Sequence, residues 1–128
     1  MQVSQTTDPG ACEVPESHPG LVESVAASLI DVDVAGDLAE LFRLLGDPTR
    51  VRILVALSVA GELCVCDLAA VVETSDTKVS QALRLLRGAG VVRNRRDGRN
   101  IYYRLDDDHV RTLLDVSREH RAHLTELN

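Results

Sequence analysis

The chain is poor in aromatic residues and has no long apolar run. Its 128 residues include one Phe, two Tyr and no Trp, although 45% are hydrophobic, so its core must be aliphatic. This length suits one domain. Charges interrupt every apolar stretch before it reaches the length of a membrane span, and no apolar segment follows a basic N-terminus. The sequence therefore predicts a cytoplasmic protein without a membrane partner.

Cysteine is also scarce. Only three are present, Cys12, Cys64 and Cys66. An odd, low count in a chain without a secretion signal favours reduced thiols that bind metal or undergo redox chemistry, and argues against a disulfide framework. We also find no nucleophile elbow and no glycine-rich phosphate loop. The sequence therefore indicates neither an enzyme nor a small-molecule substrate.

Positive charge is in deficit overall but concentrated in one segment. The net charge is −6, yet the stretch from Ser75 to Leu105 holds eight basic and two acidic side chains. A basic segment on an acidic body is typical of a single surface that faces nucleic-acid phosphates. A solvated charged face is the plainer interpretation. The form of the segment, a helix followed by a hairpin, favours phosphate contact.

The hydrophobic pattern predicts a mainly α-helical chain with one β-hairpin, in the order of a winged helix-turn-helix. Residues 1–20 are rich in Ser, Thr, Pro, Gly and acids and should form a flexible arm, and residues 21–128 should form the folded domain. We expect a hairpin at Asp97-Gly98, between strands 91–96 and 100–105. Helices are expected at 21–30, 34–45, 48–59, 63–72, from about 76 to 87 and from about 107 onward.

The helix from about 76 to 87 has the pattern of a DNA-recognition helix. Its apolar residues repeat at helical spacing and should face the core, as should four in the 48–59 helix: Val79, Ala82, Leu83 and Leu86, and Val51, Ile53, Leu54 and Leu57. In a helix-turn-helix the outward side of the second helix meets base edges and phosphates. We therefore expect DNA contacts from this side and from the hairpin arginines: Thr77, Lys78, Ser80, Gln81 and Arg84, with Arg95, Arg96 and Arg99.

Four segments together resemble the ArsR/SmtB family of metal-sensing transcriptional repressors, especially its cadmium- and lead-sensing CadC-like branch. They are residues 45–54 (LGDPTRVRIL), 62–69 (ELCVCDLA), 78–83 (KVSQAL) and 97–99 (DGR). The resemblance implies a homodimeric winged helix-turn-helix. It also implies that the dimer binds double-stranded operator DNA without metal and leaves it when metal binds. The chain departs from many relatives at Ala82, where they carry His.

Cys64 and Cys66 form the first candidate metal site. Thiolates favour soft or borderline ions such as Cd(II), Pb(II), Zn(II) and As(III). In a regular helix, residues i and i+2 point about 200° apart, so the two thiols can share an ion only at a frayed helix start or with help from another segment. Cys12 in the arm can give that help, with His18 as a further candidate. In the CadC-like branch the arm comes from the partner subunit, usually with two cysteines.

Other interpretations of the cysteine pair stay open. The arsenic-sensing branch shares the Cys-Val-Cys sequence, often with a third Cys at the position of Ala69, so an arsenite-responsive repressor is one alternative. A thiol redox switch in a DNA-binding regulator is another. The thiols can also be small packing residues, and the protein can hold a purely structural zinc ion.

The second candidate site uses Asp107, His109, His120 and His123. His120 and His123 share one helix face. The helix rises about 16 Å from His109 to His120, whereas zinc–nitrogen bonds are about 2 Å, so one helix cannot bring all four residues to one ion. Two antiparallel copies can, each giving Asp107 and His109 to one ion and His120 and His123 to the other. The geometry predicts a homodimer through the last helix, and the spacing matches the family's C-terminal zinc site.

Taken singly, each of these four residues is an ordinary surface residue or helix cap. Their common register favours a tetrahedral site of nitrogen and oxygen ligands. The sequence as a whole predicts a metal-responsive transcriptional repressor that binds operator DNA as a dimer. Cd(II), Pb(II) or Zn(II) is the expected effector, and As(III) is the alternative.

Overall fold

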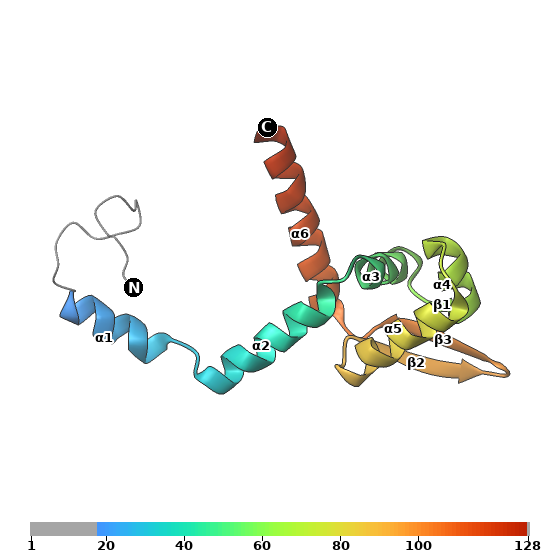
Figure 1. Ribbon diagram of the computed structural model, residues 1–128, viewed down its shortest axis with the longest axis horizontal. Helices are drawn as coiled ribbons and strands as arrows, with labels where there is room; N and C mark the ends of the chain where they lie inside the picture. Colours follow the sequence, from blue (N-terminus) through green and yellow to red (C-terminus); the bar gives the residue numbers. More distant parts are fainter. Residues whose placement is uncertain (1–17, 128) are drawn as a thin grey trace. The chain divides into compact units, whose positions relative to one another are not determined.

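Helices make up most of the protein, and a small antiparallel sheet accompanies them (Figure 1). The computed structural model describes residues 18–127. The chain divides into two units, Met1–Gly36 and Asp37–Asn128. The mainly α-helical architecture with a β-hairpin is as predicted from the sequence.

The first unit contains α1 (Pro19–Ser28) and the start of α2 (Val32–Leu45). Proline in the first turn of α1 does not destabilise the helix, because a backbone N–H at that position would have no hydrogen-bond partner within the helix. The Asp31 carboxylate caps α2 by accepting a hydrogen bond from the Val34 amide at 2.8 Å. The side chains of α1 are exposed throughout, including its large apolar ones.

In the second unit, local capping chemistry sets the bounds of α3 (Pro48–Ala60). The Asp47 carboxylate accepts a hydrogen bond from the Arg50 amide at 3.0 Å and serves as the N-cap. Gly61 ends the helix with a φ of 87°, a conformation that glycine adopts without the clash a Cβ would cause. The helix predicted at 48–59 is therefore confirmed, and it extends one residue further, to Ala60.

The helix-turn-helix consists of α4 (Val65–Val72) and α5 (Asp76–Gly88). A short turn with Glu73 in the left-handed region, at a φ of 57°, separates them. Ser75 caps α5, since its hydroxyl accepts a hydrogen bond from the Lys78 amide at 3.1 Å. The predicted recognition helix therefore forms where expected.

The sheet has three strands in the order β1-β3-β2. β2 (Val92–Asp97) and β3 (Asn100–Leu105) form the predicted hairpin. β1 (Leu63–Cys64) pairs with the other edge of β3. The prediction that a helix begins at Leu63 is therefore wrong, because the backbone of Leu63 and Cys64 pairs with β3 and overrides the local helical preference.

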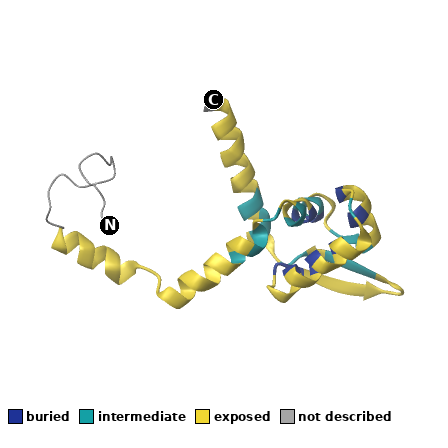
Figure 2. Cartoon of the chain, viewed as in Figure 1, coloured by how far each residue is buried: buried dark blue, intermediate teal, exposed yellow. Residues whose placement is uncertain are grey.

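The core lies among α3, α4, α5 and the start of β2 and is entirely aliphatic (Figure 2). Its buried members are Ile53, Leu54, Leu57, Leu68, Ala69, Val72, Val79, Ala82, Leu83, Leu86, Val91 and Val92. All four residues predicted to face inward from α5 are among them. One prediction for α3 is wrong: the side chain of Val51 is 37% exposed, because it lines a surface groove and not the core.

The last helix, α6 (Asp108–Leu127), joins the core only through its first half. Val110 and Leu114 pack against the core. Arg111 fixes α6 to α3 by donating hydrogen bonds to the Ser58 carbonyl at 2.8 Å and hydroxyl at 2.9 Å. Side chains 115–126 are all exposed. None of the helices in the described range combines the length and hydropathy that a membrane crossing requires.

Candidate metal centre and nucleic-acid interface

Cys64 and Cys66 lie where strand β1 passes into helix α4. Cys64 is the N-cap of α4, with an extended backbone at φ −84° and ψ 169°, and Cys66 lies in the first turn. Both are free thiols, Cys64 half-buried and Cys66 exposed. The 200° separation of i and i+2 positions applies to residues inside a helix. It does not apply here, because Cys64 lies outside the helix, so helix geometry does not exclude a shared ion.

Cys66 contacts the first residue of the recognition helix. Its Sγ lies 3.6 Å from Asp76 Oδ2, with the thiol donating to the carboxylate. The negative charge of Asp76 and this hydrogen bond raise the pKa of the Cys66 thiol. The cysteine pair is thereby connected to α5 by a side-chain contact, which the sequence alone did not indicate.

The further ligands predicted for the thiol site are placed differently. Cys12 lies outside the described residues. His18 is exposed at the N-cap of α1, in the first unit, and its side chain caps nothing. Within residues 18–127, no three side chains of His, Cys, Asp or Glu come together as a metal site. A metal ion at the two thiols would therefore require a further ligand from elsewhere.

At the start of α6, the structure brings two of the four predicted ligands together. The His109 side chain lies with its Nδ1 3.1 Å from Asp107 Oδ2, and the His109 amide donates to Asp107 Oδ1 at 2.9 Å. The hydrogen bond from the His109 side chain lowers the pKa of Asp107, and the same contact raises the pKa of His109. His120 and His123 lie in the exposed second half of α6.

The outward side of α5 carries the polar residues expected to meet DNA. All five are exposed: Thr77, Lys78, Ser80, Gln81 and Arg84. On the hairpin, Arg96 and Arg99 are exposed as well. Among the residues that the structure describes, neither of these two arginines has an ion-pair partner, so their charges are available to an anion.

Arg95 is the remaining predicted DNA contact on the hairpin, and its side chain is exposed but bonded to another side chain of the protein. Its Nε and Nη2 donate to the two carboxylate oxygens of Glu62 at 2.8 and 2.7 Å. Its guanidinium also lies 4.8 Å from the centroid of the Tyr102 ring. The hydrogen bonds from Arg95 lower the pKa of Glu62. Sequence reasoning missed Glu62, because its partner is 33 positions away and no local signal joins them.

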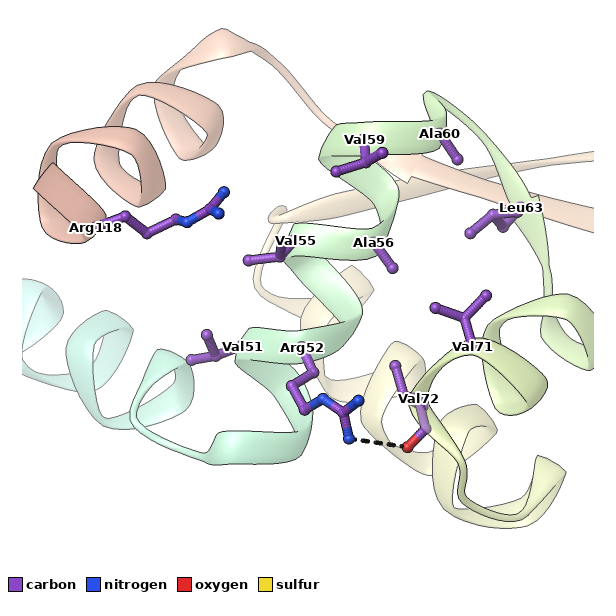
Figure 3. A pocket seen from close by; sticks show the side chains of 10 residues that line it. All are labelled: Val51, Arg52, Val55, Ala56, Val59, Ala60, Leu63, Val71, Val72 and Arg118. Atoms are coloured by element: carbon purple, nitrogen blue, oxygen red, sulfur yellow. Dashed lines mark hydrogen bonds between the residues drawn. The ribbon is translucent and has the colours of Figure 1, made fainter. Parts of the chain in front are cut away.

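An apolar groove of about 480 Å³ lies beside the helix-turn-helix (Figure 3). It is lined by α3 and α4 and, at one side, by Arg118 of α6. Val51, Val59 and Val71 line it and are exposed, at 37%, 80% and 54%. Arg52 is held at the groove by a hydrogen bond from its Nη1 to the Val72 carbonyl at 3.2 Å. Clustered exposed apolar side chains of this kind mark a contact surface.

Comparison with known proteins agrees with this geometry. Residues 47–94 match the model of the family described as "Bacterial regulatory protein, arsR family". This range runs from the N-cap of α3 into β2 and includes the cysteine pair and the whole helix-turn-helix.

Two curated relatives match nearly the whole chain. One is a transcriptional repressor SmtB homolog from Synechocystis sp., 42% identical over 98% of this chain and 92% of its own length. Another is a cadmium resistance transcriptional regulatory protein CadC homolog from Staphylococcus aureus, 38% identical over 91% of this chain and 95% of its own length. Both are transcriptional regulators and not enzymes, as predicted for this chain.

A solved structure supports the fold. It is the homodimeric winged helix-turn-helix DNA-binding domain of a possible ArsR-family transcriptional regulator from Mycobacterium bovis, with a TM-score of 0.69 and 26% identity. The match covers 80% of this chain and 95% of that chain. The predicted winged helix-turn-helix is thereby confirmed, with α5 as its second helix and the β2–β3 hairpin as its wing.

Proposed function

The chain belongs to the arsR family of bacterial regulatory proteins, and on this basis we propose that it is a transcriptional repressor released from operator DNA by a thiophilic metal ion. The repressor is a homodimer, and its effector is Cd(II), Pb(II) or Zn(II). A relative of high coverage is a cadmium resistance regulator, which supports Cd(II) among these ions.

The DNA-binding surface consists of the outward side of α5 and the tip of the wing. Gln81 reads a base edge, whereas Lys78 and Arg84 contact phosphate or guanine. Arg96 and Arg99 bring positive charge from the wing. Support comes from the exposure of these side chains and from their lack of ion-pair partners within the described residues.

The metal is held by Cys64 and Cys66, with Cys12 as the third ligand and His18 as an additional candidate. Two free thiols at an open helix start suit a soft divalent ion. The described residues of one copy supply no third ligand. We therefore propose that the arm of the partner subunit completes the site, as in the CadC-like branch that the sequence resembles.

The observation that carries the mechanism is the 3.6 Å contact between Cys66 and Asp76. An ion bound by the thiols acts directly beside the first turn of the recognition helix. Metal releases the operator if it binds the DNA-free dimer more tightly than the DNA-bound one, and by reciprocity DNA then weakens metal binding. We infer that the ion fixes α5 in a position that misfits the operator half-sites.

The second site, on α6, joins the two copies. Asp107 and His109 of one copy and His120 and His123 of the other form each tetrahedral Zn(II) site. The pairing of Asp107 with His109 supports this proposal, since half of the ligand set is already assembled. The exposed apolar side chains of the second unit, Phe42 and Val116 among them, give the dimer a surface to bury.

Operator affinity with and without Cd(II) tests this function. We would measure the fluorescence anisotropy of labelled DNA from the promoter next to the coding region. We expect Cd(II) to weaken binding about 5- to 150-fold, the usual range of allosteric coupling, and a chelator to restore it. Equal affinities would contradict the proposal. As(III) and peroxide titrations separate the arsenite and redox alternatives, and unfolding by the chelator would indicate structural zinc.

A further inference from the structure

We propose that Glu62 and Arg95 form a clamp that couples the cysteine strand to the wing, which makes Arg95 a positioning residue. This inference rests on the proposed function, since it names the contacts through which a metal ion bound at Cys64 would change the position of the hairpin. It differs from the sequence prediction that Arg95 contacts DNA.

The register of the sheet places the residues concerned in one row. Cys64 of β1 and Arg95 of β2 are both directly opposite Tyr102 of the middle strand β3. Directly opposed residues of antiparallel strands project their side chains from the same face of a sheet. Cys64, Tyr102 and Arg95 therefore share one face, and the thiol belongs to the same row as the arginine.

The arginine bridges this row from one edge of the sheet to the other. Its guanidinium passes over the Tyr102 ring at 4.8 Å from the centroid and reaches Glu62, the residue just before β1. There it makes a two-pronged contact with the carboxylate, at 2.7 and 2.8 Å. A bidentate pair fixes the relative orientation of its two segments more firmly than a single bond does. The clamp therefore links β1 to β2 in addition to the backbone ladder.

Two of the five N–H donors of Arg95, at Nε and Nη2, are bonded to Glu62. Nη1 lies 3.8 Å from Asp97, which is too far for a hydrogen bond. A phosphate that took the two-pronged Nε–Nη2 edge would have to displace Glu62. Arg96 and Arg99, by contrast, have no such partners among the described residues. The side chains that meet DNA from the wing are therefore Arg96 and Arg99, and Arg95 sets their position.

Two routes then lead from the thiols to the DNA-binding surface. Cys66 contacts α5 through Asp76, and Cys64 reaches the wing through its strand and the clamp. When an ion draws Cys64 into its coordination shell, β1 shifts against β3, and the clamp carries the shift to β2. Without the clamp, β1 is joined to the hairpin only by its two-residue pairing with β3.

The test compares three single variants, the double variant Glu62→Gln/Arg95→Lys and the variant Arg95→Gln with the wild type, all as full-length protein. Glu62→Gln keeps the side-chain size but loses the charged bidentate contact, and Arg95→Lys keeps the charge but not the planar fork. Asp97→Asn is the matched control: it removes the other acid near Arg95, and Asn-Gly suits the hairpin turn as well as Asp-Gly does. Each variant is measured for operator affinity with and without Cd(II) and for the sulfur-to-cadmium absorption band.

We expect Glu62→Gln and Arg95→Lys each to reduce the Cd(II)-dependent change in affinity about two- to fivefold, the range of an exposed ion pair. The double variant should lose no more than either single one, because both changes break the same contact. The absorption band should persist in all variants, and Asp97→Asn should respond as the wild type does. The metal-free affinity of each variant is its own reference, from which the Cd(II)-dependent change is calculated.

Two results would overturn the clamp while leaving the repressor intact. One is an unchanged Cd(II) response in Glu62→Gln. The other is a fall of about one in the slope of log affinity against log salt for Arg95→Gln, which would show that Arg95 contacts a phosphate. A wild type that ignores Cd(II) would instead contradict the proposed function itself, and the clamp with it.

Discussion

The two candidate metal sites lie in contrasting parts of the protein. Cys64 and Cys66 stand in the packed part, where one belongs to the sheet and the other contacts the recognition helix. His120 and His123 stand on the exposed half of α6, whose side chains from 115 to 126 have no buried member. An ion at the thiols would therefore act on the DNA-binding elements of its own copy. An ion in the proposed α6 site would act on the contact between copies.

The different surroundings of the two sites indicate which of them can control DNA binding. Coupling between two ligands requires an element whose position both of them affect. The thiol site has two such elements, α5 and the wing, each joined to it by contacts in the structure. Among the described residues of one copy, the α6 site is joined to the wing only beside its first half, where Arg93 of β2 donates to Asp106 at 2.9 Å, whereas His120 and His123 lie among exposed side chains. We therefore propose that the thiols release the DNA and that α6 stabilises the dimer.

The largest contrast should appear in folding stability. Leu83 is fully buried and Val116 is 55% exposed, so Leu83→Ala should lower the free energy of unfolding by about 2–5 kcal/mol and Val116→Ala by less than about 0.5 kcal/mol. Urea denaturation of each variant measures this. Equal losses of unfolding free energy in the two variants would show that the core and the second half of α6 do not differ in packing. A loss in Val116→Ala that depends on protein concentration would place Val116 in the dimer interface.

Removing one thiol should abolish the metal response. Cys64→Ser and Cys66→Ser each remove a soft ligand at nearly constant size. The coupling free energy between Cd(II) and operator, about 1–3 kcal/mol in typical allosteric proteins, should fall to near zero. The affinity of each metal-free variant for the operator is the control. It should stay within about twofold of the wild type, a smaller change than the typical coupling between two ligands. A full Cd(II) response in either variant would exclude that thiol as a ligand.

Changes on α6 should have the opposite profile. His120→Ala and His123→Ala should weaken Zn(II) binding at the second site at least about tenfold, the scale seen even for outer-shell losses. Their Cd(II)-dependent release of DNA should match the wild type. Zinc titration and analytical ultracentrifugation measure the two effects. If these variants lost the Cd(II) response, the assignment of regulation to the thiols would be wrong.

The smallest effect should come from single phosphate contacts. Lys78→Ala on α5 should reduce the slope of log affinity against log salt by about one and weaken all DNA sequences alike. Arg121→Ala, which removes a positive charge from the exposed half of α6, is the matched comparison and should leave the slope unchanged. Equal slopes for Lys78→Ala and the wild type would remove Lys78 from the DNA-binding surface.

The sequence predicted what depends on local chemistry. The helix from Pro48 to about Val59, the helix that begins at about Asp76 and the hairpin at Asp97-Gly98 each follow from a few neighbouring residues, and all occur in the structure. The inward face of α5 was predicted for the same reason, since helical spacing is a local property.

What the sequence did not predict depends on distant partners. β1 is only two residues long and exists because the edge of β3 pairs with it. The contacts of Glu62 with Arg95 and of Cys66 with Asp76 join segments that only the fold brings together. The thiols themselves were identified from their spacing. Their third ligand stays a prediction, because Cys12 lies outside the described residues.

The most direct test of the account follows metal binding and DNA release in one sample. Cd(II) is added to the repressor on labelled operator DNA, and the sulfur-to-cadmium absorption band and the anisotropy are recorded together. We predict that the band grows and the anisotropy falls along the same curve, reaching their end points at the same amount of metal. A band that saturates while the DNA stays bound would contradict the claim that metal at the cysteine pair releases the operator.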